Sequence, residues 1–146
     1  MKRTDPLIIV EELYDTSLEN VWNSITDPNE MNKWFFEQIK SFKAEEGFET
    51  EFTVEVENRK FTHLWKIVDV SPYHKIKYQW KYLEYSGNSF VTFELKEENG
   101  KVRLILTAEV LEDFPENIPE FKRESCVGGW NYFIKDSLRN YLTINA

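Results

Sequence analysis

The stretch "GGWNYFIKDSLRNYL", residues 128–142, decides the fold because it predicts the longest helix of the chain. Its apolar residues recur at steps of three and four, which places them on one face of a helix. That stripe consists of Val127, Trp130, Ile134, Leu138 and Tyr141. A helix with one continuous apolar face needs a partner surface, and the preceding sequence predicts which one.

Two adjacent glycines, Gly128 and Gly129, interrupt this helical pattern. Each costs about 1 kcal/mol relative to alanine in a helix interior. We expect the helix to start near Pro119, which places the glycine pair about two turns into it. Without side chains there, the helix backbone can press against a sheet or bend away from it. The hypothesis that follows is a wedge-shaped cavity under residues 118–127, lined by aromatic side chains of the strands.

The N-terminal part predicts one strand and two short helices. Residues 7–14 are apolar enough for a first strand. Thr16 and Glu19 have the spacing of a capping box, which predicts the start of a first helix. Asp27 and Pro28 repeat the signal as a cap followed by proline at the first helical position.

Between residues 35 and 110 the apolar period changes from helical to alternating. "FETEFTVEV" (48–56) and "KIKYQWKY" (75–82) place apolar and charged residues on opposite strand faces. Asn99–Gly100 predicts a tight hairpin between two further strands. We count seven strands, including one near 36–43. An antiparallel sheet covered by the C-terminal helix, an α+β fold in a single domain over residues 1–146, follows from this order.

Charge and composition narrow the possible partners. The net charge of −8 repels nucleic acid and anionic lipid surfaces, so no nucleic-acid partner is expected. The single cysteine, Cys126, excludes an internal disulfide framework. The apolar run at the N-terminus is too short for a signal peptide or a membrane span, so we expect no membrane insertion and a cytoplasmic location.

Two motifs resemble a known family. The early one places Val21–Trp22, Asp27–Pro28 and Trp34 after the first strand, and the closing one places Gly129–Trp130, Leu138 and Leu142 on the last helix. With the element order, they resemble the START-like helix-grip superfamily (β-α-α-β6-α). More narrowly, they resemble the family named after the C-terminal domain of the activator of the Hsp90 ATPase. The superfamily includes lipid carriers, hormone receptors and aromatic polyketide cyclases, and fold analogy does not choose among them.

Catalytic and metal-binding patterns are missing from the sequence. His63 and His74 have no metal-ligand spacing to each other or to Cys126, and no glycine-rich phosphate loop is present. Cys126 fits a packed helix residue better than a nucleophile, because no motif pairs it with a histidine. We therefore expect no metal, no cofactor and no enzymatic activity.

The first functional hypothesis is a non-enzymatic protein that binds a small apolar or amphipathic molecule between sheet and helix. Aromatic residues would form the walls, and His63 or Arg123 would supply a polar anchor. The predicted ligand-binding residues are His63, Trp65, Tyr78, Trp80, Phe93, Arg123, Val127, Trp130 and Phe133. The resemblance implies two alternatives, an interaction module for an Hsp90-type chaperone and a polyketide-cyclase-like enzyme. The sequence assigns no oligomeric state.

Overall fold

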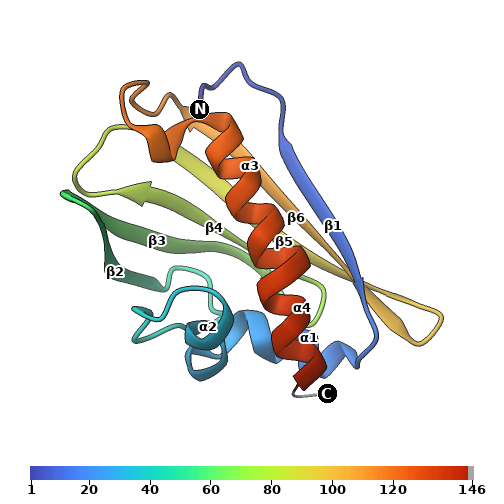
Figure 1. Cartoon of the computed structure of the whole chain (residues 1–146). Helices are drawn as coiled ribbons and strands as arrows, with labels where there is room; N and C mark the ends of the chain where they lie inside the picture. Colours follow the sequence, from blue (N-terminus) through green and yellow to red (C-terminus); the bar gives the residue numbers. More distant parts are fainter. Residues whose placement is uncertain (145–146) are drawn as a thin grey trace.

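A computed structural model describes residues 1–144 and contains one antiparallel sheet with the strand order β1-β6-β5-β4-β3-β2 (Figure 1). The strands are β1 (Ile8–Tyr14), β2 (Glu49–Val56), β3 (Arg59–Ser71), β4 (Lys75–Tyr82), β5 (Asn88–Glu98) and β6 (Lys101–Glu112). The short helices α1 (Leu18–Thr26) and α2 (Pro28–Trp34) connect β1 to the loop before β2. The first two strands therefore form the two opposite edges of the sheet.

A long helical segment lies across one face of the curved sheet (Figure 1). It consists of α3 (Arg123–Asn131), the π-helical stretch η2 (Tyr132–Ser137) and α4 (Leu138–Ile144). This arrangement confirms the predicted α+β helix-grip fold. Within residues 1–144, no helix combines the length and the apolar character needed to cross a membrane.

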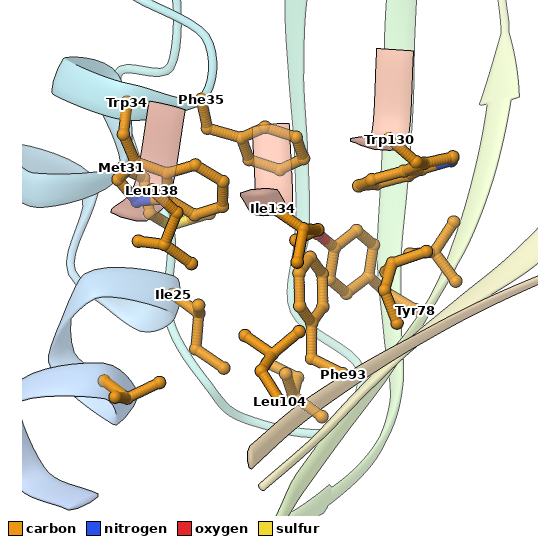
Figure 2. Packing of buried hydrophobic residues seen from close by; sticks show 14 of the residues in the cluster. Ile25, Met31, Trp34, Phe35, Tyr78, Phe93, Leu104, Trp130, Ile134 and Leu138 are labelled. Atoms are coloured by element: carbon orange, nitrogen blue, oxygen red, sulfur yellow. The ribbon is translucent and has the colours of Figure 1, made fainter. Parts of the chain in front are cut away.

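The core lies between this helical segment and the sheet. Trp130, Ile134 and Leu138 reach from the helix toward Tyr78 and other strand residues (Figure 2). All four side chains are at most 8% exposed. The predicted helical stripe is the buried face at Trp130, Ile134 and Leu138, whereas its first and last members, Val127 and Tyr141, are only partly buried. Leu142 is buried in place of Tyr141.

The prediction of a strand near 36–43 is wrong, and the sheet formed by residues 1–144 has six strands instead of seven. Residues 35–48 form a loop beside the sheet. Its buried side chains Phe35, Ile39 and Phe42 are three and four residues apart, so they do not alternate as a strand would require. The Ile39 N–H donates to the Phe36 carbonyl in a turn.

The helix caps follow the sequence with one correction. Ser17, and not Thr16, caps α1, because its hydroxyl accepts from the backbone N–H of Asn20 at 3.1 Å. The Thr16 hydroxyl accepts from the Asn20 side chain instead. Asp27 caps α2 as predicted, with its carboxylate 2.9 Å from the Asn29 nitrogen and Pro28 at the first helical position.

The start of the long helix differs from the prediction. Residues Pro119–Phe121 form a separate 3-10 turn, η1, and Lys122 is extended (φ −68°, ψ 145°) before α3 begins at Arg123. Of the two roles expected for Gly128 and Gly129, the close approach to the sheet is wrong, since a Cβ built on either residue meets no atom within 4 Å.

The glycines instead precede the point where the helix widens. The Tyr132 N–H is shared between the carbonyls of Gly128 and Gly129, and η2 follows. Within η2, the carbonyl of Ile134 accepts a hydrogen bond from the buried Tyr14 hydroxyl on β1. The N-terminal strand therefore holds the π-helical stretch in place.

Candidate functional site

A pocket of about 460 Å³ lies between the sheet and the first half of the long helix. Cys126, Gly129, Trp130 and Phe133 line it from the helical side. From the strands, its wall is formed by Val54, Val56, Phe61, His63, Trp80, Tyr82, Ser89, Val91, Ala108 and Val110. The strand wall comes from residues 54–110 and the helical wall from residues 126–133, so the fold of the chain back onto the sheet brings them together.

Strand register aligns the polar and aromatic side chains of the wall. His63 on β3 lies opposite Tyr82 on β4 and opposite Phe52 on β2. Trp80 lies opposite Ser89 on β5. Because alternate residues of a strand share one face, the period-two pattern of the sequence puts these side chains on the side that faces the helix.

The structure places the predicted ligand-binding residues in three locations. His63, Trp80, Trp130 and Phe133 line the pocket. Trp65, Tyr78 and Phe93 lie outside its lining, in the core, and each is at most 2% exposed. Figure 2 shows Tyr78 and Phe93 packed beside Ile134 of the helix.

Arg123 and Val127 lie on the other side of the helix, facing β1. The Arg123 guanidinium donates to the carbonyls of Pro6 and Leu7 at 2.6 and 3.3 Å. Its guanidinium therefore fixes the N-terminal segment and does not reach the pocket, so only His63 of the two predicted anchors is in position.

Other lining residues were not predicted. Tyr82 continues the alternation of Tyr78 and Trp80, so the pattern could have found it. Phe36, Phe114 and Phe121 come from segments without a regular period, and no local signal marks them.

Three phenylalanines of the pocket lining, Phe61, Phe114 and Phe121, form a second buried cluster, which we call the lid cluster. The Phe114 ring rests on Gly87, where a Cβ would come within 2.4 Å of it and where φ is +114°. Only glycine fits both conditions. The lid cluster therefore depends on the tight turn after β4.

His63 is a buried, neutral imidazole at the pocket wall. It is 4% exposed and stacks on Phe52 with ring centroids 4.5 Å apart. Burial lowers its pKa to about 4. Nδ1 lies 3.0 Å from the Phe61 carbonyl, which can only accept, so Nδ1 carries the proton. Nε2 is then an acceptor, and within residues 1–144 it has no hydrogen-bond partner.

The Tyr82 hydroxyl is the second polar group of the wall. It accepts the indole N–H of Trp80 at 2.8 Å. Its own O–H has no acceptor among the described residues. Burial raises the pKa of Tyr82, so the hydroxyl keeps its proton at neutral pH.

Cys126 lines the pocket as a thiol. Its Sγ donates to the Glu120 carbonyl at 3.5 Å, and burial raises the pKa of the thiol to about 11. A thiol of that pKa is a poor nucleophile at neutral pH. Within the described chain, no group of three or more His, Cys, Asp or Glu side chains is placed to hold a metal ion.

The family comparison agrees with this architecture. The model of the family described as "Activator of Hsp90 ATPase homolog 1-like protein" matches residues 15–143. The chain belongs to this family. A search of curated proteins found no match. For the Activator of Hsp90 ATPase homolog 1-like family, the match spans both of the motifs and the pocket lining from Phe36 to Phe133, and leaves out Met1.

Solved structures share the fold at low sequence identity. MLL2253 from Mesorhizobium loti is 20% identical, with a TM-score of 0.73 over 97% of this chain and 99% of its own. CalU16 from Micromonospora echinospora is 23% identical, with a TM-score of 0.65 over 93% of this chain and 73% of its own. DynU16, a protein of the dynemicin biosynthetic locus, is 18% identical, with a TM-score of 0.76 over 97% of this chain. This chain spans about half of DynU16, at 48% of its length.

Proposed function

We propose that this protein binds a small hydrophobic or amphipathic molecule in the pocket between sheet and helix and leaves it chemically unchanged. The observation that carries the proposal is a pocket of about 460 Å³ whose walls are mostly aromatic and aliphatic. Pockets of a few hundred Å³ with apolar walls and few polar groups suit small organic ligands.

Burial of apolar surface supplies the affinity in this proposal. Each Å² of ligand surface removed from water contributes about 25 cal/mol, before the cost of association. Trp80 and Trp130 offer large surfaces for this purpose, with ring centroids 5.5 Å apart and an interplanar angle of 68°. A flat ring system can contact both indoles at once.

Binding without chemistry is favoured over an enzymatic role by the state of the polar lining groups. General acid–base catalysis works best with a group whose pKa lies near the working pH. Burial moves the pKa of His63 down to about 4 and that of Cys126 up to about 11. Neither residue is poised for proton transfer at neutral pH.

The adjacent glycines provide a matched test. Gly129 lines the pocket, whereas Gly128 is exposed and does not. In Gly129→Leu the new side chain occupies pocket volume, and we expect the affinity for the neutral probe N-phenyl-1-naphthylamine to fall about tenfold or more. Gly128→Leu changes the same helix and should bind the probe as the wild type does. Equal affinity in all three proteins, measured by fluorescence titration, contradicts the proposal.

A chaperone partner is the second candidate, favoured by the edge strand β2. Glu49, Glu51 and Glu55 are exposed there in a row on one face. Such a row suits a basic protein surface. We expect this protein to change the ATPase rate of a purified Hsp90-type chaperone if that candidate is correct, and a Glu49→Lys/Glu51→Lys/Glu55→Lys variant to lose the effect. An unchanged rate at every concentration of the wild type dismisses it.

A further inference from the structure

We infer that the pocket selects a neutral aromatic molecule carrying a hydroxyl group, which donates to Nε2 of His63 and accepts from the O–H of Tyr82. The inference rests on the proposed function, since it names the class of ligand bound at the same site.

The two polar groups lie next to each other on the wall. His63 and Tyr82 are directly opposite across β3 and β4, and their ring centroids are 4.8 Å apart. Both line the pocket. Two side chains fixed by the same strand pairing present their polar atoms in a constant relative position.

Each of the two side chains makes one hydrogen bond within the protein and has one further donor or acceptor that makes none in the described structure. The Nδ1 proton of His63 is held by the Phe61 carbonyl, so Nε2 can only accept. The Tyr82 oxygen accepts from Trp80 Nε1, and its O–H remains as a donor. Within residues 1–144, no side chain or backbone group donates to Nε2 of His63 or accepts from the O–H of Tyr82. The wall thus offers one acceptor beside one donor.

A hydroxyl group matches this pair because it donates one hydrogen bond and accepts others. An ether or ketone oxygen can accept from Tyr82 but leaves Nε2 without a donor. A buried polar group left unpaired reduces affinity, so the site discriminates between a hydroxyl and its methyl ether.

Charge disfavours an anionic ligand. The described lining includes the acidic residues Glu109 and Glu120 and no lysine or arginine; Glu109 is exposed, and the Glu120 carboxylate is paired with Arg59. The amino group of Met1, which is also at the lining, donates to the Phe121 carbonyl. A carboxylate or sulfonate would lose its hydration here, and the nearby cations, Arg59 and the Met1 amino group, already donate to protein oxygens.

The rest of the wall suits a flat body behind the hydroxyl. Phe36, Trp80, Trp130 and Phe133 surround the pocket with tilted or edge-to-face contacts, and Phe36 and Phe133 lie 5.2 Å apart at 61°. Aromatic rings prefer such geometry with a further ring. A fused aromatic ring with a hydroxyl at its edge therefore fits both parts of the site.

The test uses four probes of one shape: 2-naphthol, 2-methoxynaphthalene, naphthalene and 2-naphthoate, each titrated by tryptophan fluorescence and calorimetry at pH 7. For the wild type we expect 2-naphthol to bind about tenfold more tightly than 2-methoxynaphthalene or naphthalene, and 2-naphthoate to bind most weakly. His63→Phe and Tyr82→Phe should each reduce the preference for 2-naphthol to about threefold or less. Tyr85→Phe, which removes a hydroxyl from a ring packed on the lid cluster outside the pocket lining, should keep it.

The outcomes distinguish a failure of the hydroxyl inference from a failure of the proposed function. Equal affinity of the wild type for 2-naphthol and its methyl ether, or tighter binding of 2-naphthoate, overturns the hydroxyl inference and leaves a general apolar pocket. Absence of binding by all four probes overturns the proposed function together with the inference. Naphthalene serves as the folding control, because it meets neither polar group and should bind the variants as it binds the wild type.

Discussion

Arg59 and Glu120 form a two-point ion pair that joins β3 to the turn η1 over the pocket. The Nε–Oε1 distance is 2.9 Å and the second nitrogen lies 2.6 Å from Oε2. Both side chains are less than one-third exposed, at 28% and 29%. Planar, two-point contacts of this kind hold geometry better than a single ionic contact. The pair thus fastens the chain beside the lid cluster.

Glu120→Gln should loosen this fastening. We expect the free energy of unfolding to fall by about 1 kcal/mol and the modification of Cys126 by a thiol reagent to become faster in the native state. Because Arg59 holds the pKa of Glu120 below its usual range, the difference from the wild type should fade as the pH falls through that lowered value. Glu116→Gln is the control, since its ion pair with Lys2 is exposed. Equal labelling rates in all three proteins contradict the assignment.

The lowered pKa of His63 predicts how the free energy of unfolding depends on pH. Its pKa is lowered from 6.5 to about 4 by burial, so the unfolded chain binds its proton first as the pH falls. Stability should therefore decrease between about pH 6.5 and pH 4, by up to about 3 kcal/mol from this residue alone. Urea unfolding at pH 7.5 and 4.5 measures the loss. His63→Phe should remove this component, and His74→Phe at an exposed turn should retain it; the same loss in both variants counts against the prediction.

Removing the hydroxyl group should have opposite effects on the free energy of unfolding at Tyr14 and at Tyr78. The Tyr14 hydroxyl donates to the Ile134 carbonyl, and Tyr14→Phe should lower the free energy of unfolding by about 1–2 kcal/mol. The fully buried Tyr78 hydroxyl has no partner in the described structure. Tyr78→Phe should leave stability unchanged or raise it by about 1 kcal/mol. Chemical denaturation of both variants decides, and a larger loss for Tyr78→Phe would refute the assignment.

Gly87→Ala should destabilise the protein by more than about 2 kcal/mol, because the new methyl group meets the Phe114 ring and φ is positive. Gly47→Ala separates the two causes. Its φ is +87° but its surroundings are open, so we expect a loss of about 1 kcal/mol from backbone strain alone. Thermal unfolding provides the measurement. Similar losses at both positions would mean that the lid cluster tolerates the displacement of Phe114.

The sequence predicted the elements correctly where the local residue pattern agrees with the place of the segment in the folded protein. Alternation in 48–56 and 75–82 predicted strands β2 and β4, and Asn99–Gly100 forms the expected hairpin with φ values of +52° and +81°. The segment 36–43 failed because its aromatic residues fill a gap beside the sheet. That environment exists only after distant elements have packed.

The sequence predicted which face of the sheet lines the pocket, but not how far along the strands the pocket extends. Trp65 and Trp80 face each other on neighbouring strands, yet only Trp80 lines the pocket. The period of a strand states which side a residue takes, whereas the position of the helix along that strand decides whether a void remains. Arg123 was misplaced for the same reason, since the rotation of the helix turns it toward β1.

The pairing of β1 with β6 limits how early the sheet can be completed during synthesis. Ile8 lies beside Ala108, so β1, which precedes the other five strands along the chain, waits for β6, which follows them. Until then its apolar residues lack their final neighbours, and Tyr14 has no Ile134 carbonyl to bind. The sheet is completed only after β6 has been made, which places this chain among those whose assembly is governed by distant contacts.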